Sequence, residues 1–203
     1  MTSRERMKQR GRQTRQAGFT LIETMIAMMV LTIGILALEA MLGTGLAYMT
    51  TSQYDYIAQQ KASEAVESVF EARDIGQATW STICNVGSPV CNSGVFLIGN
   101  LPLCGAGADG IIGTADDFNG TACAGGALAA PDAILVPNSS GNLNPPVSLP
   151  LSSFTRSIVI SSVTNGAGQT ISNLRQITVT INYAAGTFKN RKYTLNAYIS
   201  NFS

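Results

Sequence analysis

The chain has 203 residues, a formal net charge of +1 and no histidine. This length suggests one globular domain with an accessory segment, or two small domains. Because histidine is the usual general base at neutral pH and the commonest metal ligand, its absence excludes Ser-His-Asp and Cys-His catalysis and weakens most zinc hypotheses. The chain also has no G-x-S-x-G motif and no phosphate-binding loop. The sequence therefore predicts a protein that is not an enzyme.

The charge is unevenly distributed along the chain. Residues 1–18 carry six Lys or Arg against one acid, which leaves a net charge of −4 on residues 19–203. The basic stretch is short and ends at a mostly apolar run from Phe19 to Tyr48. This order is typical of a segment that directs membrane insertion with the N-terminus in the cytoplasm. It is not the pattern of a nucleic-acid-binding surface, so we expect no nucleic-acid partner.

Three interpretations of this segment compete: a signal peptide cut after the apolar run, a plain membrane anchor, and a leader cut before the run at Gly18-Phe19. Glu23 discriminates among them, because a carboxylate near the start of a membrane helix is costly and neither of the first two needs one. Glu39 lies sixteen residues further on, which is roughly 24 Å along a helix. We interpret it as a solvated charge at the outer membrane boundary.

The basic leader followed by Gly18, Phe19 and Thr20-Leu21-Ile22-Glu23 resembles the class III signal of type IV pilins and type II secretion pseudopilins. This resemblance implies that prepilin peptidase cuts after Gly18 and that Phe19 becomes N-methylated. It further implies insertion in the bacterial inner membrane, interaction with an inner-membrane assembly platform, and contact with other pilin subunits in a helical extracellular fibre. The new Phe19 amine and the Glu23 carboxylate are both costly in lipid, so they should pair across subunits and set their register.

Helical periodicity continues past the apolar run. Apolar residues recur at spacings of three and four from Tyr54 to Phe70, and an acidic stripe lies on the opposite face. The sequence thus predicts one long helix over residues 19–76, with a membrane and assembly half at 19–48 and an amphipathic half at 49–76. Residues 1–18 would be the leader.

Residues 77–150 form a variable region rich in Gly, Ala, Ser, Asn and Pro, without a sustained helical or strand pattern. It holds all four cysteines, and an even, clustered number suggests disulfides and an oxidising compartment. Four cysteines allow three connectivities, of which Cys84–Cys91 with Cys104–Cys123 is the simplest. A structural zinc site is a distant second, because the spacings fit no common pattern.

The second of these loops contains an acidic, Gly-rich stretch. Its carboxylates and amide could bind calcium through hard oxygen ligands: Asp109, Asp116, Asp117 and Asn119. The alternative is a cluster of Asx turns, in which the side chains cap their own backbone. No other cofactor is expected.

Residues 151–203 read as three strands with short links, at 155–163, 174–183 and 189–200. Such a meander is antiparallel, and its apolar face should cover the apolar stripe of the long helix. The sequence therefore predicts an α+β chain with a long N-terminal helix on a C-terminal antiparallel sheet of about three or four strands, with a disulfide-tied loop region between them.

This layout resembles the pilin fold along the whole chain. Beyond the signal, residues 26–48, Gln59-Gln60-Lys61-Ala62 and the ending 195–200 resemble minor pilins of the type IV pilus modification (PilV) type. That resemblance implies a role in priming or modifying a pilus and, in some cases, in adhesion at its tip. A minor pseudopilin of a type II secretion system shares the signal, so this alternative stays open.

Overall fold

The computed structural model describes residues 18–136, 141, 146–185 and 188–201. For Val136 and Phe188 it describes the backbone only. The expected leader, residues 1–18, lies outside this description except for Gly18. The chain divides into two compact units, Met1–Gly45 and Leu46–Ser203, which are treated separately below.

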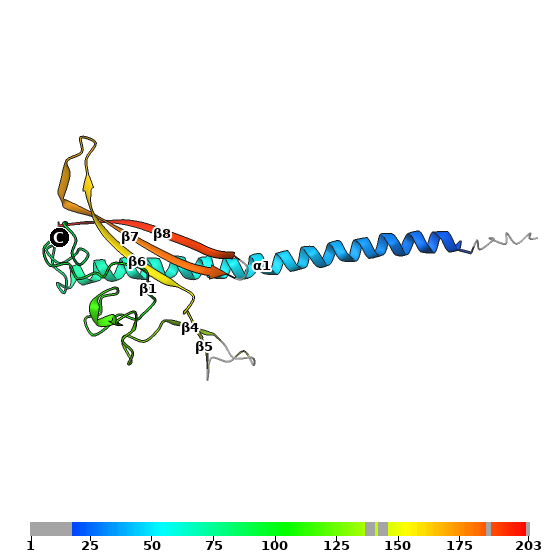
Figure 1. Cartoon of the computed structure of the whole chain (residues 1–203), viewed down its shortest axis with the longest axis horizontal. Coiled ribbons are helices and arrows are strands. Elements are labelled where there is room, and N and C mark those ends of the chain that lie inside the picture. The colour runs from blue at the N-terminus through cyan, green and yellow to red at the C-terminus, as the bar shows by residue number, and fades with distance from the viewer. Residues whose placement is uncertain (1–17, 137–140, 142–145, 186–187, 202–203) are drawn as a thin grey trace, which may run out of the picture. The chain divides into compact units, whose positions relative to one another are not determined.

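Helix α1 (Leu21–Asp74) contributes to both units (Figure 1). Thr20 begins it, because its side-chain Oγ1 and its carbonyl both accept from the backbone N–H of Glu23, at 3.3 and 3.1 Å. This is the usual way to satisfy a free N–H group in the first turn. Beyond the last turn, Gly76 adopts a positive φ of 77°, a conformation that glycine tolerates best and that commonly follows a helix.

The second unit is built on a four-stranded antiparallel sheet with the strand order β1-β6-β7-β8 (Figure 1). These strands are β1 (Leu101–Pro102), β6 (Thr155–Thr164), β7 (Thr170–Ala185) and β8 (Phe188–Ser200). The three long strands follow one another in the chain and pair directly with their neighbours. β1 pairs with only the first two residues of β6, so most of the outer edge of β6 has no strand partner among the described residues.

Residues 46–74 of α1 pack on one face of this sheet. The buried positions of the helix recur at three and four and are mostly small: Thr51, Ala58, Ala62, Ala65, Val66, Ser68, Val69 and Ala72. In β7, Ile177, Val179 and Ile181 are fully buried on alternate positions, as expected for a strand with one covered face. A stack of three rings completes this core, with Phe154 lying 5.5 Å from Tyr54 and 5.3 Å from Tyr183 between ring centroids.

Between helix and sheet, the described residues form only short elements. They are η1, a turn of 3-10 helix (Ala115–Asp117), and the strands β2 (Phe118–Asn119), β3 (Ala122–Cys123), β4 (Ala133–Val136) and β5 (Val147–Pro150). β2 pairs with β3 and β4 with β5, each pair antiparallel. Outside these ladders, the region is held by further backbone hydrogen bonds and by bonds from buried polar side chains.

The clearest case is Asn85, which is 4% exposed. Its amide donates to the carbonyl of Ile158 at 2.7 Å and accepts from the N–H of Ile160 at 2.7 Å. One side chain therefore stands in for the missing strand on the outer edge of β6. This contact covers backbone groups that would otherwise be buried without partners.

The structure confirms the predicted fold class. It is α+β, with an N-terminal helix packed on an antiparallel sheet and two disulfides in the region after the helix, an arrangement consistent with a pilin fold. The expected strand at 174–183 is longer than predicted, since β7 begins at Thr170.

Candidate functional site

The segment around the expected cleavage point lies at the start of α1. Phe19 is exposed and directly precedes the first helical turn, which contains Glu23. An acid in this turn is favoured by the helix dipole. Within the part of the chain that the structure describes, Glu23 forms no ion pair. Its carboxylate is therefore available to a partner from outside the subunit.

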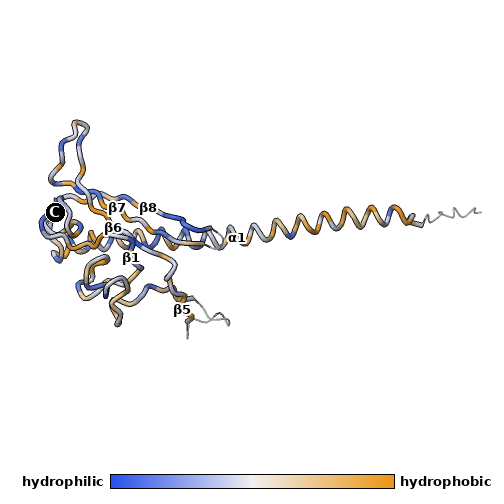
Figure 2. Tube along the Cα trace, in the orientation of Figure 1, coloured by the Kyte–Doolittle hydropathy of each residue, from blue (hydrophilic) through white to orange (hydrophobic). Residues whose placement is uncertain are grey.

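The apolar half of α1 exposes large side chains all around the helix, from Leu21 to Leu42. Figure 2 shows this stretch as the most continuous hydrophobic part of the chain. Among the described residues, α1 is the one helix long and apolar enough to cross a membrane. A helix that is apolar on every side needs a membrane or a protein core around it.

The polar side chains within this stretch are satisfied locally. The hydroxyls of Thr24, Thr32 and Thr44 donate to the carbonyls of Leu21, Met29 and Met41 at 2.8, 2.8 and 2.9 Å. Such bonds to the preceding turn leave no hydroxyl unpaired in hydrocarbon. Apart from Glu23 and Glu39, the stretch is therefore compatible with an apolar environment.

The cysteines pair as Cys84–Cys91 and Cys104–Cys123, with Cα–Cα distances of 6.1 and 5.5 Å. This is the nearest-neighbour pairing that the sequence suggested as simplest. Closing loops of this size stabilises a fold by about 2.5–3.5 kcal/mol each in the chain-entropy model. Cys84 and Cys104 are fully buried, so each disulfide anchors its loop to the core of the second unit.

The structure brings three of the predicted calcium ligands together. Oxygens of Asp109, Asp116 and Asp117 lie within 4.8 Å of one another, while Asn119 is an exposed residue of β2. Each carboxylate already has partners. Asp117 accepts from the N–H groups of Gly107 and Gly113, both at 2.6 Å. Asp116 accepts from the N–H of Asp109 at 3.1 Å, and Asp109 accepts from the N–H of Ile111 at 2.8 Å.

The electrostatics of this loop also bear on the calcium hypothesis. Burial raises the pKa of Asp117, an effect that its backbone hydrogen bonds oppose. Partial burial also acts to raise the pKa of Asp116, but hydrogen bonds from Thr114 and from the backbone outweigh it, so the pKa of Asp116 is lowered overall. The observed bonds are those of an Asx-turn cluster. Calcium binding by this loop stays a prediction, and an ion there would have to compete with these N–H donors.

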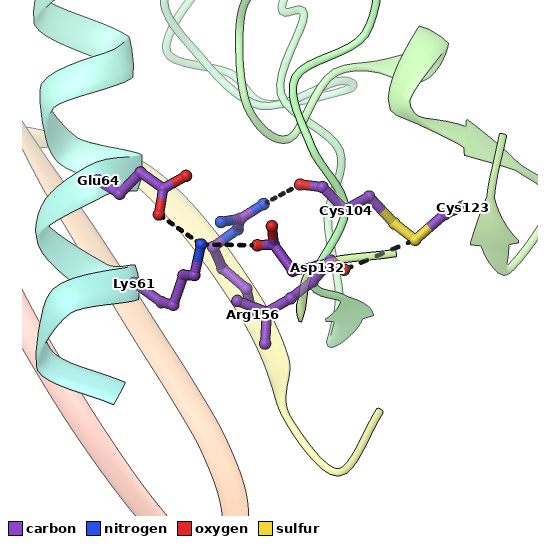
Figure 3. A network of polar contacts seen from close by, with 7 residues as sticks. Lys61, Glu64, Cys104, Cys123, Asp132 and Arg156 are labelled. Atoms are coloured by element: carbon purple, nitrogen blue, oxygen red, sulfur yellow. Dashed lines mark hydrogen bonds and ion pairs between the residues drawn. A yellow bond between two sulfur atoms is a disulfide. The ribbon is translucent and has the colours of Figure 1, made fainter. Parts of the chain in front are cut away.

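A network of charges that the sequence did not reveal links α1 to the loop region and to β6 (Figure 3). Lys61 Nζ lies 2.8 Å from Glu64 Oε2 and 3.1 Å from Asp132 Oδ2. Beside them, Arg156 is 3% exposed and donates from Nη2 to the carbonyl of Cys104 at 3.2 Å. Burial lowers the pKa of Arg156, although Asp132 and the other nearby acids act to raise it.

Two atoms of this network, Arg156 Nη1 and Asp132 Oδ2, are buried without a well-formed hydrogen bond, although the latter lies in the ion pair with Lys61. A signal for Arg156 was present in the sequence. Alternation along β6 places it on the same face as Ile158 and Ile160, which are buried. An arginine on that face must find partners inside the protein.

Comparison with known families bears on the first of these features. Residues 13–38 match the model of the prokaryotic N-terminal methylation motif. The match covers the expected cleavage point, Glu23 and most of the apolar run. No curated protein and no solved structure gives a significant match. The motif supports a type IV pilin-like protein, a structural subunit rather than an enzyme.

This motif also carries implications for processing and location. A class III signal implies cleavage by a prepilin peptidase and assembly with other pilins. Together with the apolar half of α1, it is consistent with a single-pass anchor in the inner membrane.

Proposed function

We propose that the chain is a minor pilin. Prepilin peptidase cleaves it between Gly18 and Phe19, residues 19–48 hold it in the bacterial inner membrane, and it is then incorporated into a type IV pilus. The observation that carries this proposal is the methylation motif over residues 13–38, joined to a helix that exposes apolar side chains on every side. Of the minor pilins, it most resembles the PilV type, which implies a role in pilus assembly or adhesion.

In this proposal Glu23 recognises the neighbouring subunit. After cleavage, the amine of Phe19 lies four residues before Glu23, at the start of the same helix. Both charges enter an apolar surrounding when subunits associate, and each then needs an opposite charge. The absence of an ion pair to Glu23 among the described residues supports this role.

The experiment compares Glu23→Gln with Glu39→Gln, a matched change further along the same exposed part of α1. Both variants should be processed at Phe19, since neither alters the cleavage residues. Loss of a pairing worth at least about 1.4 kcal/mol lowers incorporation by about tenfold, so Glu23→Gln should be depleted from sheared fibres by at least that factor. Glu39→Gln should remain near the wild-type level. Equal incorporation of both variants would contradict the role of Glu23.

The alternative function is a minor pseudopilin of a type II secretion system, which the same motif would serve. Deletion of the gene separates the two functions. A minor pilin predicts fewer surface pili with normal secretion of exported enzymes. If the deletion instead leaves the normally secreted enzymes inside the cell and does not change the number of pili, the pseudopilin function is favoured.

A further inference from the structure

The sheet has an irregularity where β6 and β7 approach their connecting turn. Pairing is regular up to Ser162 opposite Arg175, and then shifts so that Val163 lies opposite Ile171. The intervening residues 172–174 therefore have no partner in β6. Bulges of this kind re-aim side chains and often lie beside functional sites.

A cleft of about 350 Å³ opens at this irregularity. Its wall combines the loop closed by Cys84–Cys91 with the two strands, and its lining residues are Pro89, Val90, Ser162, Thr170, Ile171, Ser172, Leu174 and Arg175. The volume lies at the lower end of the range for small-molecule sites, where apolar walls and a few converging polar groups are usual. Three hydroxyls and one guanidinium supply the polar groups here.

Arg175 is the unusual member of this lining. It is 5% exposed, and its Nη1 donates to the carbonyls of Trp80 and Ile83 at 2.5 and 2.7 Å. Its guanidinium carbon lies 4.1 Å from the centre of the Trp80 ring. No carboxylate of a described residue pairs with it. Arginine keeps its charge when buried, so within the described part of the chain this positive charge is balanced by carbonyl dipoles and a ring face alone.

The two ends of the guanidinium differ in how well they are satisfied. Nη1 makes two short bonds, whereas the single bond of Nη2, to the carbonyl of Val90, is 3.5 Å long. Nη2 therefore retains donor capacity on the side of the cleft that Val90 lines. A carboxylate is the group that a guanidinium binds best, through charge-assisted hydrogen bonds.

We propose that this cleft binds a small hydroxylated carboxylate, such as a sugar acid, with Arg175 holding the carboxylate and the hydroxyls of Ser162, Thr170 and Ser172 binding the ligand's own hydroxyl groups. The hydroxyl-bearing residues are exposed, so a ligand can reach them from solvent. The site lies wholly within the second unit. It does not depend on incorporation of the chain into a fibre.

The test uses the full-length protein in detergent micelles, where no fibre is needed. Calorimetric titration with glucuronate should show saturable binding, whereas glucose, which lacks the carboxylate, and acetate, which lacks the hydroxyls, should bind at least about tenfold more weakly, or about 1.4 kcal/mol. Equal binding of glucose or acetate would overturn the proposal, as would no binding of glucuronate. Neither outcome bears on whether the chain is processed at Phe19 or assembled into a fibre.

Variants localise the binding. Arg175→Lys keeps a charge but loses the planar fork, and it should weaken glucuronate binding about tenfold or more. Because Arg175 also holds the first disulfide loop, Ser162→Ala with Ser172→Ala provides a second variant that alters only exposed hydroxyls. It should lower affinity at least threefold with an unchanged melting temperature. Thr178→Ala, on the opposite face of β7, is the matched control. If it lowers the affinity for glucuronate as much as the double serine variant does, the ligand does not bind in this cleft.

Discussion

The amide of Asn85 provides the sharpest test of how the loop region is held to the sheet. Asn85→Ala removes the group that satisfies Ile158 C=O and Ile160 N–H, whose residues are 3% and 2% exposed. Leaving a buried backbone group unpaired costs about 1–3 kcal/mol, less where the structure relaxes to admit water. Two such groups give an expected loss of about 3 kcal/mol in the free energy of unfolding. For a domain of this size the loss lowers the melting temperature by roughly 6–12 °C.

The loss can be measured by denaturant unfolding of the full-length protein in detergent, followed by the fluorescence of Trp80, the one tryptophan of the chain. Asn85→Asp should be at least as destabilising, because it keeps the acceptor for Ile160 N–H but places a carboxylate against the carbonyl of Ile158. Asn100→Ala is the matched control. Asn100 is exposed and accepts one surface hydrogen bond, from Asn182, so its loss should cost less than about 0.5 kcal/mol. If Asn85→Ala lowers the free energy of unfolding by less than about 1 kcal/mol, Asn85 does not take the place of a strand at the edge of β6.

Two further predictions concern pH and calcium. Burial acts to lower the pKa of Lys61, but its contacts with Glu64 and Asp132 outweigh this and raise the pKa above its ordinary 10.5. For Tyr183, burial and the hydrogen bond to Asp55 both raise the pKa above its ordinary 10.0. Both groups bind a proton more tightly in the folded state, so their stabilisation is complete below pH 10 and is lost as pH rises through the folded pKa values. Melting temperature should therefore fall above about pH 10, and a flat profile to pH 12 would contradict both contacts. If the acidic loop binds calcium, millimolar calcium raises the melting temperature of the wild type but not of Asp116→Asn, and indifference of the wild type to calcium and to chelator would end that hypothesis.

The elements with strong local periodicity could be predicted from the sequence. Apolar residues at three and four define the helix, and alternation at Ile177, Val179 and Ile181 defines the central strand, because each pattern reflects one buried face. The additional length of β7 was missed. Its first residues, Thr170 to Asn173, are mostly polar and lie at the irregular end of the ladder, where no hydrophobic alternation marks the strand.

Contacts between distant segments could not be predicted in the same way. Asn85 reaches β6 across more than seventy residues, and nothing in its neighbourhood distinguishes it from a turn residue. Arg156 and Arg175 are different, since alternation places both on the buried face of their strands. A charged residue at such a position indicates an internal partner, and this signal leads to the charge network and to the cleft.

For the segment around the expected cleavage point, the sequence is more informative than the structure. Gly18, Phe19 and Glu23 are recognisable from sequence alone, whereas the structure of a single subunit gives Glu23 no partner within the described chain. The partner that the proposal requires belongs to another subunit. The chemistry of that contact therefore has to be tested on the processed protein.

Mass spectrometry of the protein isolated from its native membrane or fibres tests the central claim most directly. The account predicts a chain that begins at an N-methylated Phe19 and that lacks two hydrogens for each of its two disulfides. A chain that still begins at Met1, or one cut after the apolar run, would contradict it.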